Sequence, residues 1–331
     1  MTESTKAKDT VFDSQNVSRL AVQEIKRRRA NSLVGIKTMV PLLDEDLTPL
    51  RTGELIVVLG YTSNYKSGLM QFISRKAIPQ LADHKDAIVI YATWEQSVEE
   101  HGMMELAATS RIDASKLIQG DLTTDEWKRM MKAAVDRAIS PLWLVGHSSQ
   151  AGKRRPRLSM EDINKALAYI VDERGKVPAL VCLDYAQRIR PDKNGPRREQ
   201  VMAIVDQAKD LALSFSCPVI IGTQSGRQVL ERKWKLPQIS DGQETSNLEQ
   251  SADKFISLWM PKTSEPPESM VGVPEIPVTD NLLYIGLLKQ KFGPAPRIYA
   301  LHVEPAITEI YAKDRRDPTP AYHARMGEVV E

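Results

Sequence analysis

The chain has 331 residues, of which 42% are hydrophobic and 27% are charged, and its formal net charge is +2. This composition indicates a globular protein with one large core, and so small a net charge gives no general sign of nucleic-acid binding. The roughly 20-residue apolar run of a membrane-spanning helix is missing, and residues 1–16 are too polar for a signal peptide, so we expect a cytoplasmic protein that does not bind membranes.

The N-terminal region and the cysteines carry little recognisable chemistry. We expect residues 1–16 to be disordered and residues 17–30 to form an amphipathic helix with a basic last turn. Residues 33–50 read as a loop-rich lead-in to the first strand. Cys182 and Cys217 have no CxxC spacing and no neighbouring histidines, which argues against a zinc site and favours buried free thiols.

The first strongly patterned segment is an apolar strand that breaks at a glycine and is followed by Lys-Ser, where a helix is expected from about residue 67 to residue 81. This is nearly a P-loop, in which backbone N–H groups wrap the phosphates, Lys66 reaches them as a point charge and Ser67 binds Mg²⁺. Tyr65 replaces the second glycine of that motif, so we expect weaker or altered phosphate binding. For the loop alone, a chance Lys-Ser remains the alternative. The residues expected to hold the nucleotide here are Gly60, Ser63, Asn64, Tyr65, Lys66 and Ser67.

Apolar segments alternate with helical patterns along the rest of the chain. This alternation predicts an α/β fold with a mostly parallel sheet, helices on both of its faces and antiparallel strands at the C-terminal end. Residues 262–280 are expected to form a hairpin or loop, and residues 313–331 a tail. The expected helices span residues 98–109, 124–138, 160–173 and about 199–216. The expected strands span residues 87–92, 142–145, 179–184, 218–224, 254–260, 282–289, 297–302 and 308–311.

Three expected strands end in a polar side chain suited to nucleotide hydrolysis. Asp184 ends a run of four apolar residues, as the Mg²⁺-binding carboxylate of a Walker B strand does. Glu95 follows the strand after the P-loop helix, where a carboxylate could orient or deprotonate an attacking water. Gln224 ends the strand after Asp184, where an amide could sense the γ-phosphate. Each residue alone could equally be an ordinary polar residue at the end of a strand or the start of a helix.

With these motifs in order, residues 18–310 resemble the C-terminal RecA-like ATPase domain of DnaB-type replicative helicases. The resemblance rests on motifs along the whole segment, of which residues 241–253 (DGQETSNLEQSAD) and 289–294 (KQKFGP) are the most specific. It implies a RecA-like P-loop core over residues 31–312, and ATP and Mg²⁺ as ligands. Residues 17–30 match the linker helix that docks on a neighbouring subunit. The collar domain of such helicases has no counterpart here, since only residues 1–30 precede the core, and this leaves any loader or effector protein unidentified.

The resemblance also assigns roles to single residues. Lys66 and Ser67 would contact the phosphates and Mg²⁺, Asp184 the metal, Glu95 would be the catalytic base and Gln224 the γ-phosphate sensor. Lys289 and Lys291 match the pair that reaches into the neighbouring subunit's nucleotide, which implies shared active sites in a homo-oligomer, expected to be a hexameric ring.

Several positions depart from the family pattern or concern nucleic acid. Lys291 stands where Arg is usual, and a lysine lacks the planar fork of arginine, so we expect slow hydrolysis.

In the central DNA-contacting loop, Gln243 and Ser246 stand where Arg and Gly are usual, which should weaken phosphate contacts. Basic residues after the Walker B strand would line the channel of a ring, although such runs are more often solvated loops. The residues expected to contact single-stranded DNA are Arg188, Arg190, Lys193, Arg197, Arg198, Gln243, Glu244 and Ser246.

Two functions of different classes follow from this sequence. The first is an ATPase that drives a helicase-like ring along single-stranded DNA, which the retained Glu95, Asp184 and Gln224 favour. The second is an assembly protein that recruits a partner to DNA, regulated by nucleotide and hydrolysing little ATP, which Tyr65 and the altered loops favour. We favour the enzyme, because a chain without hydrolysis has no evident need for all three of those side chains.

Overall fold

The computed structural model describes residues 12–29, 35–151, 157–192, 194–242, 250–272, 275–312 and 323–324. Its contacts divide the chain into two units, Met1–Gly35 and Ile36–Glu331. The first unit contains helix α2 (Ser14–Arg29), which begins at Ser14 and not at the expected residue 17. The Asp13 carboxylate accepts a hydrogen bond from the Asn16 N–H at 2.7 Å, which caps the helix earlier than the apolar pattern indicates. None of the described helices combines the length and the apolar character needed to span a membrane.

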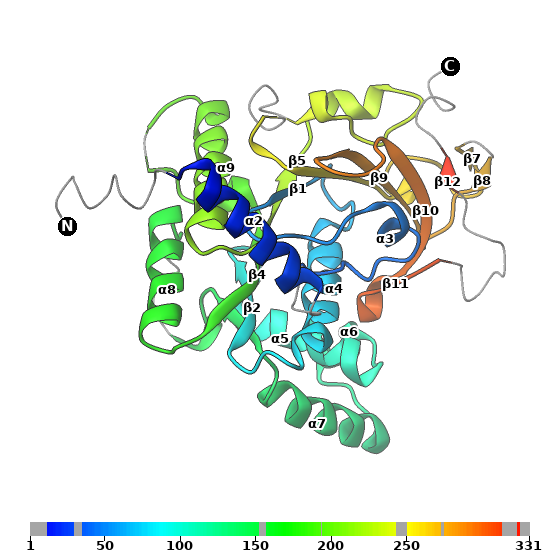
Figure 1. The fold of residues 1–331 in the computed structure, drawn as a ribbon. Coiled ribbons are helices and arrows are strands. Elements are labelled where there is room, and N and C mark those ends of the chain that lie inside the picture. The colour runs from blue at the N-terminus through cyan, green and yellow to red at the C-terminus, as the bar shows by residue number, and fades with distance from the viewer. Residues whose placement is uncertain are drawn as a thin grey trace. The chain divides into compact units, whose positions relative to one another are not determined.

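The second unit is built around one sheet with the strand order β11-β10-β9-β6-β1-β5-β4-β2-β3, and β12 also pairs with β10 (Figure 1). From β6 to β3 the neighbouring strands are parallel, whereas β9, β10 and β11 are antiparallel additions. The predicted fold class is therefore confirmed. The strands are β1 (Leu55–Gly60), β2 (Ala87–Thr93), β3 (Leu142–Val145), β4 (Val177–Asp184), β5 (Val219–Gln224), β6 (Lys254–Trp259), β9 (Leu282–Gln290), β10 (Arg297–Glu304), β11 (Glu309–Tyr311) and β12 (His323–Ala324).

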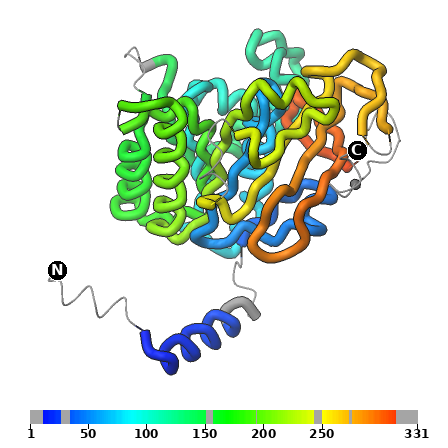
Figure 2. Tube along the Cα trace, turned by 90° about the horizontal axis from the view of Figure 1, so that it is seen from above, coloured from blue at the N-terminus to red at the C-terminus, as the bar shows by residue number. Residues whose placement is uncertain are grey.

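Helices cover both faces of the parallel part, which is why β1 is buried along its whole length. Helices α8 (Met160–Asp172) and α9 (Arg197–Ser214) lie side by side on one face and pack on alternate residues of β1, β2, β4 and β5 (Figure 2). On the other face, α4 (Lys66–Ala77) approaches β5 so closely that a Cβ on Gly222 would lie 3.0 Å from Met70. Helices α5 (Val98–Ser110), α6 (Ala114–Gln119) and α7 (Thr124–Ala138) lie together below the sheet in Figure 1.

Element boundaries differ from expectation where a local signal is weak or competing. The helix expected over residues 67–81 is α4 followed by a 3₁₀ turn, η1 (Ile78–Leu81), because Pro79 cannot continue an α-helix. The short helix α6 was not predicted, although Asp113 caps its start. Residues 262–280 contain the small hairpin β7 (Met270–Val271) and β8 (Ile276–Pro277), and β12 lies within the expected tail. Cys182 and Cys217 are buried free thiols, as predicted.

Candidate nucleotide-binding site

A pocket of about 550 Å³ lies at the C-terminal ends of the parallel strands. The pairing register places Gly60 of β1 beside Gln224 of β5 and Thr93 of β2 beside Asp184 of β4, so the loops after these strands share one edge of the sheet. The structure thus brings together the three polar strand ends and the Lys-Ser loop that the sequence singles out. The residues that line the pocket are residues 62–68, Glu95, Gln96, Asp184, Tyr185, Gln224, Met260, Lys262 and Pro305.

The loop between β1 and α4 has the geometry of an anion cradle. Ser63 and Tyr65 both adopt left-handed backbone conformations, with φ of 63° and 64°, and α4 begins directly after them at Lys66. The free N–H groups at the start of α4 therefore face the pocket end of the loop. Asn64 is buried: its Oδ1 accepts a hydrogen bond from the Met260 N–H at 2.6 Å, and its Nδ2 donates to the Thr62 carbonyl at 3.0 Å. This side chain fixes the loop to the end of β6.

The Tyr65 side chain packs on the first turn of α4. A Cβ on Gly68 would lie 2.6 Å from the Tyr65 ring, so the phenol occupies the space that a side chain at residue 68 would need. Burial raises the pKa of the Tyr65 hydroxyl, which has no hydrogen-bond partner among the described residues. The loop therefore keeps a glycine-type conformation at Tyr65 while the ring lies against the helix. The expected loss of phosphate affinity stays a prediction.

Lys66 is partly buried in the wall of the pocket. Its Nζ donates hydrogen bonds to the carbonyls of Gly60 and Tyr61, both at 2.9 Å. Burial lowers the pKa of Lys66 to about 8, and the neighbouring Asp184 and Glu95 carboxylates act in the opposite direction. An anion in the cradle would favour the charged lysine in the same way.

Asp184 is buried beside Lys66, and one of its oxygens is held by a neighbouring strand. The Tyr91 hydroxyl donates to Asp184 Oδ2 at 2.8 Å, whereas Oδ1 accepts no hydrogen bond within the described part of the chain. Burial raises the pKa of the Asp184 carboxyl, opposed by Tyr91, Ser67 and Lys66. One carboxylate oxygen and the Ser67 hydroxyl are hard ligands of the kind that Mg²⁺ takes together with phosphates and water, so the residues fit this ion. No cluster of three or more acidic, histidine or cysteine side chains that could hold a metal alone occurs among the described residues.

Glu95 and Gln224 approach the pocket from the two strands beside β4. The Glu95 carboxylate is half exposed, and its Oε1 lies 4.0 Å from Nη2 of Arg188, a residue of the loop after β4. The Gln224 amide donates a hydrogen bond to the Thr62 hydroxyl of the P-loop. The first contact links the proposed base to a basic loop, and the second links the end of β5 to the phosphate cradle.

The similarity of this chain to known families agrees with the geometry of the pocket. The model described as the DnaB-like helicase C terminal domain matches residues 35–307. The chain belongs to this family.

Individual relatives agree with this membership in the DnaB-like family. The chain is 26% identical over 294 residues to the replicative DNA helicase DnaB of Geobacillus stearothermophilus, a match that covers 85% of this chain and 58% of that protein. It is 25% identical over 252 residues to the replicative DNA helicase DnaC of Bacillus subtilis, covering 74% of this chain and 52% of that protein. The chain thus spans little more than half the length of the curated relatives it matches.

Two solved structures share the fold of this DnaB-like chain. One, described as an ATPase domain, matches with a TM-score of 0.74 and 19% identity, covering 91% of this chain and 99% of that one. A DnaB-like replicative helicase, solved in a study of its interactions with primase, matches with a TM-score of 0.71 and 19% identity, covering 91% of this chain and 67% of the other. At this identity the likeness establishes the fold.

Lys289 and Lys291, the residues that match the family's trans-acting pair, do not line the pocket of their own chain. Lys289 pairs with Phe255 near the start of β6, which runs parallel to β1, so the two lysines lie at the sheet edge opposite the P-loop. The Lys289 ammonium donates to the Ala252 carbonyl at 2.7 Å, and Lys291 is exposed in the turn after β9. From there, neither lysine reaches the pocket of its own chain.

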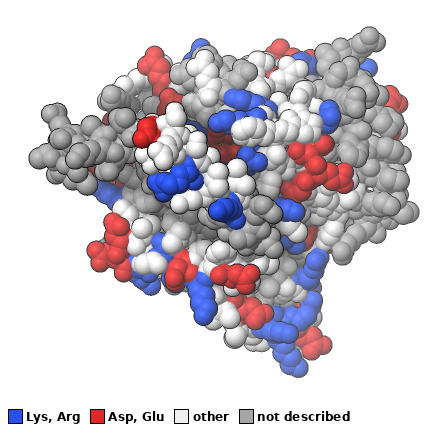
Figure 3. Space-filling model, viewed as in Figure 1, with Lys and Arg blue, Asp and Glu red and all other residues white. Residues whose placement is uncertain are grey.

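The expected nucleic-acid contacts are only partly described. Arg188 faces Glu95, Arg190 pairs with Asp162 at 3.2 Å, and Arg197 donates to the carbonyl of Gln187, so several of these side chains have contacts within the subunit. Basic and acidic side chains are interspersed over the described residues seen in Figure 3. Arg198 is also described, whereas Lys193, Gln243, Glu244 and Ser246 lie outside the described residues.

Sequence reasoning missed the residues that hold the pocket residues and the neighbouring elements in place. Tyr91 holds Asp184, and on α4 the side chains of Gln71 and Arg75 make polar contacts to the loop after β2, to α5 and to β11. A tyrosine in an apolar strand is ordinary, and so gave no signal. Gln71 and Arg75 offered a weak one, since both are polar and follow Ser67 at four-residue intervals on a helix that had to be buried.

Proposed function

We propose that this chain binds ATP and Mg²⁺, hydrolyses the nucleotide, and forms a ring that uses hydrolysis to move along single-stranded DNA. The observation that carries the proposal is the pocket at the carboxyl edge of the sheet, where Lys66, Ser67, Glu95, Asp184 and Gln224 meet. Membership in the DnaB-like helicase family supports the same function.

The chemistry follows from where the side chains lie. The start of α4 and Lys66 bind and orient the phosphates, and they stabilise negative charge that grows during phosphoryl transfer. Asp184 and Ser67 would hold Mg²⁺, which neutralises phosphate charge when bound. Glu95 lines the same pocket and takes the proton of the attacking water. Gln224 couples the γ-phosphate to the P-loop through Thr62.

The assembly completes each site with a second subunit. Because Lys289 and Lys291 lie at the sheet edge opposite the pocket, they are suited to reach the nucleotide of a neighbour. Helix α2 carries exposed apolar side chains, among them Val17, Leu20 and Ile25, which suits a helix that packs on another subunit. A closed hexameric ring satisfies this head-to-tail contact in every subunit.

Single-stranded DNA would pass the loops that follow β4. Arg188 connects this surface to the pocket, because it belongs to the basic loop and its Nη2 lies 4.0 Å from Glu95 Oε1. We further propose that a loader or effector protein places the assembly on DNA, as the solved DnaB-like helicase is described together with primase.

A second candidate is an assembly protein that is controlled by nucleotide and hydrolyses little of it. It is favoured by Tyr65, whose left-handed backbone is strained for a residue with a side chain, and by Lys291 in place of the usual arginine. In that case nucleotide binding would close the ring and recruit a partner without translocation.

Steady-state ATP hydrolysis, measured with and without single-stranded DNA on a sample whose mass is followed by light scattering, separates the two functions. We expect hydrolysis that DNA stimulates and a ring-sized mass. We expect Lys66→Ala to abolish hydrolysis and Glu95→Gln to leave only a residual single-turnover rate. Nucleotide-dependent assembly with no measurable hydrolysis would establish the second function. A monomer that neither binds nor hydrolyses ATP would exclude both.

A further inference from the structure

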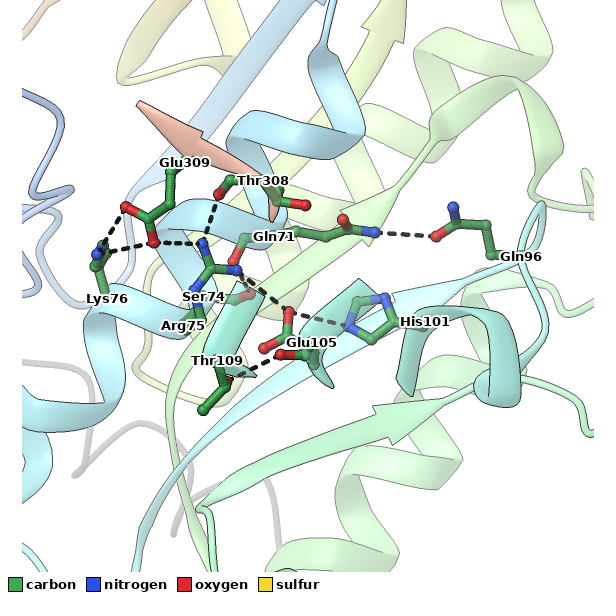
Figure 4. A network of polar contacts seen from close by, with 10 residues as sticks. All are labelled: Gln71, Ser74, Arg75, Lys76, Gln96, His101, Glu105, Thr109, Thr308 and Glu309. Atoms are coloured by element: carbon green, nitrogen blue, oxygen red, sulfur yellow. Dashed lines mark hydrogen bonds and ion pairs between the residues drawn. The ribbon is translucent and has the colours of Figure 1, made fainter. Parts of the chain in front are cut away.

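A buried glutamine on the P-loop helix holds the loop that carries Glu95. Gln71 is 2% exposed, and its Nε2 donates a hydrogen bond to Gln96 Oε1 at 3.0 Å. Figure 4 shows the two amides pointing toward each other, one from α4 and one from the loop after β2. Burying an amide is unfavourable unless it finds a partner, and Gln96 is that partner.

The loop itself is closed by short-range hydrogen bonds. The Thr93 hydroxyl donates to the Gln96 carbonyl at 3.2 Å, and the Gln96 N–H donates back to the Thr93 hydroxyl oxygen at 3.3 Å. Glu95 therefore lies in a turn that is closed by hydrogen bonds between Thr93 and Gln96. The turn has one side-chain contact to α4 among the hydrogen bonds of the described residues, and Gln71 makes it.

The next turn of α4 fixes the helix that follows Glu95. Ser67, Gln71 and Arg75 follow at four-residue intervals and so lie on one face of α4. Nη1 of Arg75 lies 3.7 Å from Glu105 of α5, and its Nη2 lies 3.1 Å from Glu309 of β11 (Figure 4). One helix face thus carries the Mg²⁺-binding serine, the contact to the Glu95 loop and the contact to α5.

We propose that Gln71 is a positioning residue for Glu95, holding the Glu95 loop in place relative to Lys66 and Ser67 through Gln96. The proposal rests on the proposed function, in which Glu95 is the catalytic base. A base must stay within hydrogen-bond reach of the attacking water, and a displacement of about 1 Å can cost on the order of a hundredfold in rate. Arg75 supports the same geometry by fixing α5. Gln71 does not line the pocket, so it acts on the loop and not on the nucleotide.

Gln71→Met tests this with little change of side-chain volume. We expect kcat to fall at least about tenfold while the dissociation constant of a fluorescent ADP analogue stays within about twofold, because the phosphate cradle is untouched. Hydrogen exchange should become faster at the backbone N–H groups of residues 94–97. Gln119→Met, at an exposed glutamine of α6, is the matched control and should change none of these quantities.

Two further variants distinguish positioning from general stability. In a Glu95→Gln background, adding Gln71→Met should lower the residual single-turnover rate no further, because the group it positions is gone. Gln71→Met combined with Gln96→Met should regain part of the lost kcat, since two apolar side chains leave no unpaired amide.

An unchanged kcat in Gln71→Met, or an equal further loss in the Glu95→Gln background, would overturn the proposal. If the parent chain hydrolyses no ATP, the proposed function fails. The exchange rates of residues 94–97 then still show whether Gln71 holds the loop, and unchanged rates would overturn that as well.

Discussion

At the scale of single residues, a glycine in the first turn of α4 leaves the room that the tyrosine ring of the P-loop needs. Tyr65 has φ of 64° and ψ of 21°, a left-handed conformation that costs roughly 1–2 kcal/mol for a residue with a Cβ. Its ring then needs room on α4, and that room exists because residue 68 is Gly68. The loop keeps its shape through this pair, so the missing glycine does not by itself remove the phosphate cradle.

Gly68→Ala should therefore be harmful only while Tyr65 is present. The added Cβ would lie 2.6 Å from the tyrosine ring, and such overpacking costs about 1–3 kcal/mol of unfolding free energy. In a Tyr65→Gly background the same substitution should be neutral or stabilising. Urea unfolding of the four proteins measures this coupling, and equal costs in both backgrounds would show that the two residues are independent.

His101 makes stability depend on pH. Burial, with the charges of Arg137 and Arg75, lowers its pKa to about 3, and the ring packs against Tyr91 at 4.4 Å. Because the unfolded chain binds this proton near pH 6.5 and the folded chain does not, stability is lost as pH falls from about 6.5 toward about 3, by at most about 1.4 kcal/mol per pH unit.

His101→Phe should flatten this acid decline, because a phenyl ring keeps the contact with Tyr91 and takes up no proton. Glu105 faces the same site and is present in both proteins, so the difference between them reports His101. Urea unfolding free energies across that pH range provide the measurement. Parallel curves for parent and variant would mean that His101 is protonated in the folded state.

The residues that line the pocket were predictable because their signals are local. Lys66 and Ser67 follow a strand directly, and Asp184 and Gln224 end strands whose carboxyl edges must meet in a parallel sheet. Gln71, Tyr91 and Asn64 act through partners far away in the sequence. Asn64 lines the pocket and also accepts a hydrogen bond from the Met260 N–H, and no spacing rule shows which strand end comes to lie beside a loop.

At the scale of elements, the β9–β10 hairpin is fixed at its end by one glutamine. Gln290 donates to the carbonyls of Asp46 at 3.0 Å and Pro294 at 2.7 Å, and it accepts from the Thr48 N–H at 3.2 Å. It therefore joins the turn that carries Lys291 to the lead-in before β1.

Gln290→Ala should release this turn. Losing the hydrogen bonds of this side chain should lower the unfolding free energy by about 1–3 kcal/mol and speed hydrogen exchange over residues 291–296. Gln119→Ala removes an exposed glutamine and should do neither. Unchanged exchange in the turn would show that the backbone pairing of β9 and β10 holds it without Gln290.

The main elements were predictable from periodicity, and the exceptions have physical causes. Helix α7 and strand β3 match their expected bounds because a Thr123 capping box and a short apolar run mark them clearly. The expected bounds of α4 were wrong at Pro79, and α6 is too short to show a period. Strand β12 exists by pairing with β10, which no local signal reveals.

At the scale of the whole molecule, the second unit places the pocket at one edge of the sheet and Lys289 and Lys291 at the opposite edge. Mixing two inactive variants tests whether this reflects a shared site. Lys66→Ala keeps Lys291 but damages the pocket. Lys291→Ala keeps the pocket but lacks the lysine that would reach a neighbour. Mixed in equal amounts, they should restore about a quarter of the parent activity, the share of interfaces that pair two intact halves.

A mixture of Lys66→Ala with Glu95→Gln is the control for that experiment. Both substitutions damage the pocket, so no arrangement of subunits restores it. Recovery in this control, or its absence in the first mixture, would contradict sites shared between subunits.

The strand order has a consequence for how the chain is made. The partners of β1 are β5 and β6, which are synthesised long after it, so this apolar strand has at least one unpaired edge until the chain has grown past Trp259. Closing such distant contacts is slow, and an open apolar strand is prone to pair with other chains. The pocket is therefore among the last parts to form, and truncated products would need protection by chaperones.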